Sequence, residues 1–167
     1  LEDQVIALQA KVDDGEQYSR RLCLRIDGIP LPANGREETP EEIRETVKKV
    51  IKEVGVSVPD DVIDRAHRIG KDKIVEGKRN RQVIVRFVSF HYRSLIYKAR
   101  KNSKKYRIYL DLTKNRSYLL SKANELIKQK KLKDSFAFAD LNCRLCLKLC
   151  NKFNYFSTYD DLMEILG

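Results

Sequence analysis

The stretch RRLCLRIDGIP, residues 20–30, restricts the fold more than any other part of the chain, because it alternates apolar and polar side chains and then stops. Successive side chains of a strand point to opposite faces of a sheet. We therefore expect Leu24 and Ile26 to face a core, with Cys23 and Arg25 on the other side. A glycine and a proline then end the strand, since both weaken pairing. This pattern predicts a sheet with an arginine on its open face.

Positive charge is concentrated in the middle of the chain. Residues 63–133 carry 22 Lys and Arg against 5 Asp and Glu, a net charge of +17, whereas the whole chain carries +10. Side chains of like charge at that density repel one another unless a bound polyanion neutralises them or solvent screens them. Nucleic acid is therefore the first partner to consider, and a basic surface without a partner is the alternative. No apolar run is long enough to span a membrane, so no membrane partner is expected.

The first 19 residues have the spacing of a coiled coil. Leu1, Val5, Leu8 and Val12 are 4, 3 and 4 residues apart, as at the a and d positions of a heptad. A helix this short is unstable alone in water, so it needs partner helices or a surface of its own domain. Valine at a with leucine at d favours a dimer.

Residues 20–111 are predicted to form a strand, a helix, two strands, a helix and a strand. Thr39, Pro40 and Glu42 start the first helix as cap, first helical residue and capping-box partner. Strands follow at 63–69 and 82–88, separated by a basic hairpin loop. Ser89 caps the second helix, and the last strand covers 107–110.

This order of elements is that of the ferredoxin-like arrangement found in RNA-recognition-motif domains. It predicts that the first and third strands pair at the centre of the sheet, so that Arg25 and Arg86 are neighbours on one open face. The outward positions of these two strands hold Cys23, Arg25, Ile84 and Arg86, without an aromatic residue. Nucleic acid would therefore be held through its phosphates, with little reading of base identity.

Residues 112–167 are predicted to form a second, smaller unit. A helix over 113–131 precedes strands at 136–139, 144–150 and 153–156, with Asn151 and Lys152 as a hairpin turn. Ser157 or Thr158 caps a last helix. The chain is thus expected to be an α+β protein with a coiled-coil end (1–19), an RNA-recognition-motif-like domain (20–111) and a C-terminal nucleic-acid-binding domain (112–167).

The cysteines do not indicate a metal site or a disulfide framework. Cys143, Cys146 and Cys150 have C-x2-C-x3-C spacing, but zinc takes four ligands and no histidine follows them. Alternation puts Cys143 on one face of a strand, with Cys146 and Cys150 on the other. We therefore expect ordinary strand cysteines in a reducing compartment, and neither a metal nor a cofactor.

An enzyme is the main competing hypothesis from another class. Asp111 and Asp140 would serve as metal-binding carboxylates, or His91 beside Ser89 as a base. Asp111 lies where helix capping is the common role, and a nucleophile needs a third group that orients its base. No glycine-rich phosphate loop is present, so catalysis is not expected.

Several strings in a fixed order resemble the first-open-reading-frame protein of LINE-type (non-LTR) retrotransposons, the transposase-22 family. They are RRLCLRIDGIP, IDRAHRIGK, RQVIVRFVSF, YKARK, YLDLTKNRSYLLSKANEL and FADLNCRLCLKL before FNYF. The resemblance covers almost the whole chain. Leu22 and Cys23 depart from it, since family members carry polar residues there.

The resemblance implies a homotrimer that binds single-stranded RNA and DNA and acts as a nucleic-acid chaperone in a cytoplasmic ribonucleoprotein, also with access to the nucleus. The family's basic positions correspond to Arg21, Arg25, Arg86 and Arg100. With the basic segment that follows them, they give the predicted binding set: Arg21, Arg25, Arg86, Arg100, Lys101, Lys104, Lys105 and Arg107. We expect most of this set to line a groove between the two domains. A structural oligomerisation module with an incidental basic surface is the alternative, and duplex DNA binding lacks a helix-turn-helix context.

Overall fold

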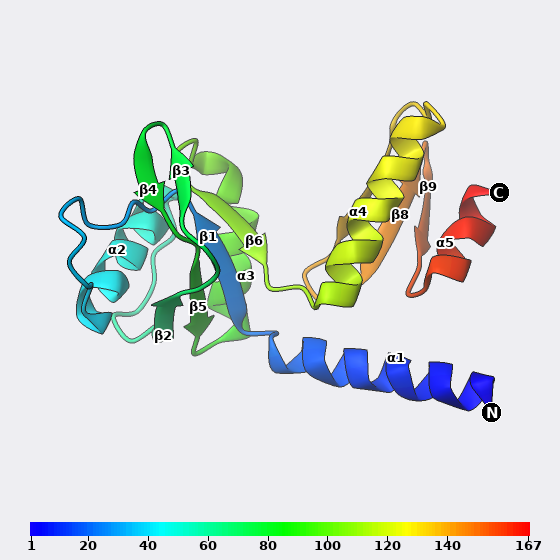
Figure 1. Ribbon diagram of the computed structural model, residues 1–167, viewed down its shortest axis with the longest axis horizontal. Coiled ribbons are helices and arrows are strands. Elements are labelled where there is room, and N and C mark those ends of the chain that lie inside the picture. The colour runs from blue at the N-terminus through cyan, green and yellow to red at the C-terminus, as the bar shows by residue number, and fades with distance from the viewer. The chain divides into compact units, whose positions relative to one another are not determined.

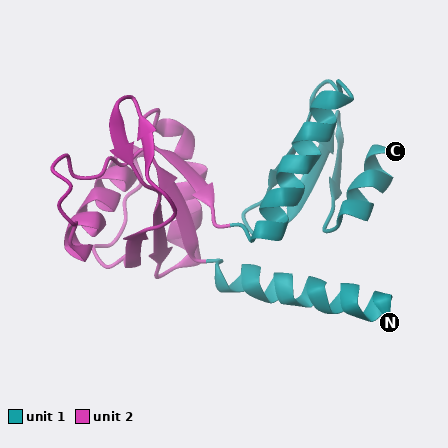
Figure 2. Cartoon of the chain, viewed as in Figure 1, with its two compact units in different colours: residues 1–21, 112–167 teal, residues 22–111 magenta.

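The computed structural model describes all residues from 1 to 167. They form two compact units (Figure 2). Unit 2 is Leu22–Asp111, a continuous segment. Unit 1 combines Leu1–Arg21 with Leu112–Gly167, so the N-terminal helix belongs with the C-terminal part of the chain. The protein is a mixed α+β structure with five α-helices and antiparallel sheets.

Unit 2 has a four-stranded sheet, two α-helices, a short 3-10 helix and a separate two-stranded hairpin (Figure 1). Its elements are β1 (Cys23–Asp27), α2 (Pro40–Glu53), β2 (Ile63–Arg68), β3 (Lys73–Val75), β4 (Lys78–Asn80), β5 (Val83–Phe87), α3 (Phe90–Lys98), η1 (Arg100–Asn102) and β6 (Arg107–Leu110).

The sheet of unit 2 has the strand order β2-β5-β1-β6, and all its pairs are antiparallel. The predicted pairing of the first strand with the strand at 82–88 is confirmed, because Leu24 lies opposite Val85. Arg25 lies opposite Ile84, and Arg86 opposite Cys23. Arg25 and Arg86 are thus diagonal neighbours on one face of the sheet, as expected.

One face of this sheet is buried and the other is open. Leu24, Ile26, Val83, Val85 and Phe87 are almost fully buried, as their alternation predicts. They form a core together with apolar residues of α2 and α3, such as Val47, Val50 and Ile96. The intervening residues of β1 and β5 are only half-buried. Helix packing on one face therefore leaves the other available to a ligand.

The predicted helix starts are confirmed. Thr39 accepts a hydrogen bond from the Glu42 backbone amide, with Pro40 at the first helical position. Ser89 caps α3 in the same way through the amide of Tyr92. Gly55 has a φ of +82° just after the end of α2, the left-handed conformation that terminates many helices.

Unit 1 pairs three helices with a three-stranded antiparallel sheet of order β7-β8-β9. The core of unit 1 contains Leu119, Ala123 and Ile127 of the helix at Lys114–Gln129, which pack against alternate residues of the sheet. Thr113 caps that helix, and Thr158 caps the last one. The elements are α1 (Glu2–Ser19), α4 (Lys114–Gln129), β7 (Ser135–Ala139), β8 (Leu145–Leu149), β9 (Lys152–Tyr155) and α5 (Tyr159–Leu166).

The C-terminal end of α1 is hydrogen-bonded to the start of α4. Gln17, only 3% exposed, accepts a 2.9 Å hydrogen bond at Oε1 from the Thr113 amide. Asp13 accepts from the Thr113 hydroxyl at 2.7 Å and from Arg116 Nε at 2.8 Å. Arg20 donates to the Leu112 carbonyl at 3.2 Å. These polar contacts fix the end of α1, whereas its apolar positions lie elsewhere on the helix.

Two local predictions need correction. The turn between β8 and β9 is Cys150 and Asn151, because Leu149 pairs with Lys152. Cys143 and Cys150 lie outside β8, each with φ near +60° in a turn, so the alternation does not apply to them. The predicted basic hairpin after residue 69 is confirmed, because β3 and β4 pair as an antiparallel ribbon with a Glu76-Gly77 turn. None of the helices is long and apolar enough to cross a membrane.

Candidate functional site

The open face of the unit 2 sheet carries polar side chains from all four strands. Arg25 lies between Ile84 of β5 and Tyr109 of β6. Tyr109 is 42% exposed and is an aromatic residue on this face that the sequence analysis did not identify. The alternation in RIYL was the signal, since Ile108 and Leu110 are buried. The face thus offers the Tyr109 ring on one edge strand and the exposed His67 imidazole on the other, since His67 lies opposite Ile84.

Arg25 is held in place by other residues of the protein. Its Nε donates to Asp111 Oδ1 at 2.7 Å, and its Nη1 donates to Gln82 Oε1 at 3.1 Å. Asp111 is 3% exposed, and the Gln82 amide donates in turn to Asp27. Arg25 therefore neutralises a buried carboxylate, and Asp111 does not cap α4.

Arg86 is more accessible than Arg25. Its side chain is 43% exposed and its Nε lies 3.4 Å from Asp64 Oδ2, with Asp64 half-exposed. A surface ion pair of this kind contributes little and is screened by salt. Arg65 of β2 lies directly opposite Arg86 in the sheet. The two guanidinium groups give this end of the face a net positive charge, which can attract a phosphate group.

The remaining predicted binding residues fall into two groups, those that stack on a tyrosine and those that are exposed without a carboxylate partner. Arg100 stacks on the Tyr97 ring at 4.0 Å and donates to the Tyr97 carbonyl. Arg21 is arranged in the same way on Tyr18, in unit 1. In contrast, the exposed residues near β6 have no carboxylate within ion-pair distance. They are Lys101, Lys104, Lys105 and Arg107.

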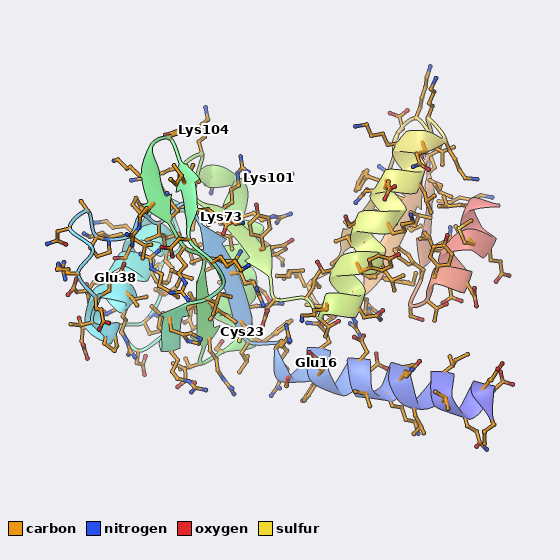
Figure 3. The ribbon with its side chains drawn as sticks, in the orientation of Figure 1. Glu16, Cys23, Glu38, Lys73, Lys101 and Lys104 are labelled. Carbon is orange, nitrogen blue, oxygen red and sulfur yellow. The ribbon has the colours of Figure 1, made fainter.

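These four cations are therefore the predicted binding residues best placed to contact an external anion. Lys104 lies beside the β3-β4 hairpin, where Lys73 is also found (Figure 3). The local sequence does not distinguish them from Arg25, because the partner of Arg25 is 86 residues away along the chain. The fold thus divides the predicted binding residues into those that contact a partner within the protein and those that have no carboxylate partner and can contact a ligand.

The outer face of the unit 1 sheet is an aromatic surface that the sequence analysis missed. In one row across the strands, Lys148 lies between Phe136 and Phe153. The lysine Nζ is 5.4 Å from the first ring centroid and 5.9 Å from the second. Phe136 is 47% exposed and Phe153 61% exposed. We call this row, with the next one, the aromatic face.

The second row of the aromatic face holds Phe138, Cys146 and Tyr155. Arg144 lies over the Tyr155 ring at 4.7 Å, and its Nε donates to Asp140 at 2.9 Å. The opposite face of the sheet packs on α4 through Ala137, Leu145 and Leu147. This surface could have been found from the sequence, because the alternation in SFAFA and FNY puts the aromatic residues of both strands on the face opposite the core.

The residues of the enzyme hypothesis have structural partners. Asp140 accepts hydrogen bonds from the backbone amides of Asn142 and Arg144, both at 2.9 Å. Ser89 caps α3, and His91 packs edge-on against Tyr92. Asp111 and Asp140 belong to different units and each is engaged by an arginine. The structure therefore brings together no acid and base from this set.

The predicted oligomerisation residues lie along α1 and are exposed. Leu1 is 97% exposed, Val5 49%, Leu8 61% and Val12 68%. Ile6 is also half-exposed. These residues do not pack on the core of unit 1, which is formed by α4, the sheet and α5. An apolar stripe in water is unfavourable, so it is a candidate contact surface for other chains.

The cysteines should differ in reactivity. Burial is the largest cause that raises the pKa of the Cys146 thiol above its usual value, with a contribution from Asp140. Cys143 is also buried, whereas Cys150 is exposed in the β8-β9 turn. Iodoacetamide should therefore modify Cys150 first in the folded chain, since only accessible thiolates react. Peptide mass spectrometry at successive times measures this order, and equal rates at Cys146 and Cys150 would contradict it.

Comparison of the chain with known protein families, and with the sequences of curated proteins, finds no match.

Proposed function

We propose that the chain binds single-stranded nucleic acid, chiefly RNA, and acts as an oligomeric nucleic-acid chaperone. The observation that carries this proposal is the aromatic face, where Phe136 and Phe153 flank Lys148. Bases stack on such rings whatever their identity, and a nearby ammonium group attracts the phosphates. A ligand with unstacked bases and a continuous charged backbone fits this surface better than a duplex does.

Unit 2 supports the same ligand by different means. Its strand order, β2-β5-β1-β6, is the one expected for the ferredoxin-like arrangement of an RNA-recognition motif. Its open face has Tyr109 as an exposed ring and Arg86 as an accessible cation. Phosphate contacts from the unpaired residues Lys101, Lys104, Lys105 and Arg107 supply affinity without sequence information. We infer broad coating of RNA, as the LINE-type resemblance implies.

Self-association is the third part of the proposal. The exposed stripe of Leu1, Val5, Leu8 and Val12 favours contact with the same helix of other chains, and we propose the homotrimer of the LINE-type family. Tethering several binding surfaces raises the effective concentration of each, which suits strand exchange. The proposed setting is a cytoplasmic ribonucleoprotein that also enters the nucleus.

Fluorescence anisotropy with a short labelled RNA strand tests the binding proposal. Affinity should fall by about 300-fold between roughly 50 mM and 200 mM salt if about six phosphates are contacted, because counterions are released. The same strand annealed to its complement should bind more weakly, since its bases are no longer available for stacking. Equal affinity for strand and duplex, or no salt dependence, would contradict the proposal.

The alternative function is a structural oligomerisation module, which the exposed stripe on α1 also favours. Light scattering and a gel shift on the same sample separate the two. A chain that forms oligomers but does not shift single-stranded RNA at low salt is such a module. A shift of the single-stranded RNA band supports the nucleic-acid-binding function.

A further inference from the structure

A pocket of about 320 Å³ in unit 2 lies between the β3-β4 hairpin, the end of β1 and the segment that leads into β6. Its basic lining residues come from segments far apart in the chain. They are Lys73, Arg81, Lys104, Lys105 and Arg107. Two carboxylates, those of Asp27 and Glu76, also line it. The excess of cations distinguishes this pocket from the open face of the sheet.

Positive charge exceeds negative charge in this pocket, because five basic side chains line it against two carboxylates. Lys73, Lys104, Lys105 and Arg107 have no carboxylate within ion-pair distance, whereas most arginines elsewhere in the chain are paired. Asp27 already accepts a hydrogen bond from the Gln82 amide at 2.9 Å. Four like charges around one concavity repel one another, so an anion of high charge would relieve the repulsion.

The walls of the pocket are built by specific backbone contacts. Gly28 has a φ of +99°, and a Cβ at this position would lie 2.6 Å from the Lys105 carbonyl oxygen. Glycine therefore permits the close approach that brings the lysine segment against β1. Ser103 holds the same segment, because its hydroxyl accepts from the Tyr106 amide and donates to Glu53. The lysines thus project from an anchored backbone.

The hairpin wall is anchored at its base. Asn80, 7% exposed, pairs with Pro30, and the Leu31 amide donates to the Arg79 carbonyl at 2.9 Å. Arg81 Nε donates to the Gly70 carbonyl at 2.8 Å, which ties the start of the hairpin to its end. The pocket is therefore a preformed feature of the fold and does not depend on a mobile loop closing over it.

We propose that this pocket binds the terminal phosphate monoester of a single-stranded nucleic acid. The inference rests on the proposed function and adds a preference for chain ends. An internal phosphodiester carries one negative charge and two free oxygens, whereas a terminal monoester approaches two charges and has three. A pocket with four cations outside any ion pair matches the monoester better, because the terminal group offers both more negative charge and one more acceptor oxygen than an internal phosphodiester.

The test compares one RNA sequence with a 5′-phosphate, a 3′-phosphate or hydroxyls at both ends, using anisotropy and the full chain. One phosphorylated end should improve affinity about tenfold over the hydroxyl form, the effect of one additional charge-assisted contact. Lys104→Gln with Lys105→Gln should weaken the binding of all three RNAs, because both lysines also contribute general phosphate contacts, and it should remove the difference between the phosphorylated and hydroxyl forms. Lys52→Gln, an exposed lysine on α2 outside the pocket, is the matched control and should preserve it.

The outcomes separate this inference from the proposed function. If no RNA binds, the proposed function fails. If all three RNAs bind equally, the terminal-phosphate site is wrong and the proposed function stands. Adenosine monophosphate alone should bind far more weakly than the phosphorylated RNA; equal affinity would show a mononucleotide site and overturn the assignment to nucleic-acid ends.

Discussion

Replacing Arg68 with alanine should lower the free energy of unfolding of unit 2 by about 4 kcal/mol, the largest stability effect that we expect from one substitution. The Arg68 side chain is 9% exposed and forms an ion pair with Glu38 at 2.5 Å. It also donates to the carbonyls of Ile29, Pro30 and Arg81, at 2.6, 3.0 and 2.7 Å. Its loss leaves a largely buried carboxylate and three carbonyls without their donor.

Urea unfolding followed by circular dichroism measures this effect, and hydrogen exchange assigns it to residues 22–111. Arg79→Ala is the control, because Arg79 pairs with Asp72 at 3.5 Å and both side chains are about half-exposed. An exposed pair contributes less than about 1 kcal/mol, so the control should remain close to the original stability. Equal stability losses in the two variants would show that burial of the Arg68 network does not matter.

Replacing both Phe136 and Phe153 with alanine should weaken the binding of single-stranded RNA by about 100-fold. Stacking on an aromatic ring contributes roughly 1–3 kcal/mol per base, and two rings near the lower end of that range give this factor. Lys148 should remain in place, because β8 is held between β7 and β9. The slope of affinity against salt should therefore change little, since no cation is lost.

Tyr118→Ala provides the control for this double variant. Tyr118 is 61% exposed on α4, the helix that covers the other face of the sheet. Its replacement removes an exposed ring of unit 1 without altering the aromatic face. Anisotropy titrations of the three chains measure the effect, with circular dichroism to verify folding. Unchanged affinity in the double variant, or an equal loss in Tyr118→Ala, would exclude stacking on this face.

Local features of the fold were predictable because their causes are local. The alternation in residues 22–26 and 82–88 depends on the two-residue period of a strand, and the caps at Thr39 and Ser89 depend on a side chain three residues from its partner. The pairing of β1 with β5 followed from the order of the elements. These steps did not require knowledge of contacts between distant residues.

The roles of individual cations were not predictable in the same way. Arg25 and Lys104 are both basic residues near a strand, yet one neutralises Asp111 and the other has no carboxylate partner. The difference depends on contacts across more than 50 residues, which spacing does not encode. The aromatic face was missed for a related reason: RNA-recognition motifs stack bases on their first and third strands, whose outward positions carry no aromatic ring here, and β7 and β9 belong to the other unit.

The bonds between α1 and α4 also affect the order in which the chain can fold. Unit 1 is interrupted by the whole of unit 2, so its two segments meet only if a long loop is closed. Leu24 pairs with Leu110, which means that a folded unit 2 already holds its own two ends together. Closing a loop of that length through an unfolded chain would cost about 4 kcal/mol of entropy. Unit 2 should therefore form before unit 1 during synthesis, and α1, although it is made before unit 2, acquires its contacts with α4 only afterwards.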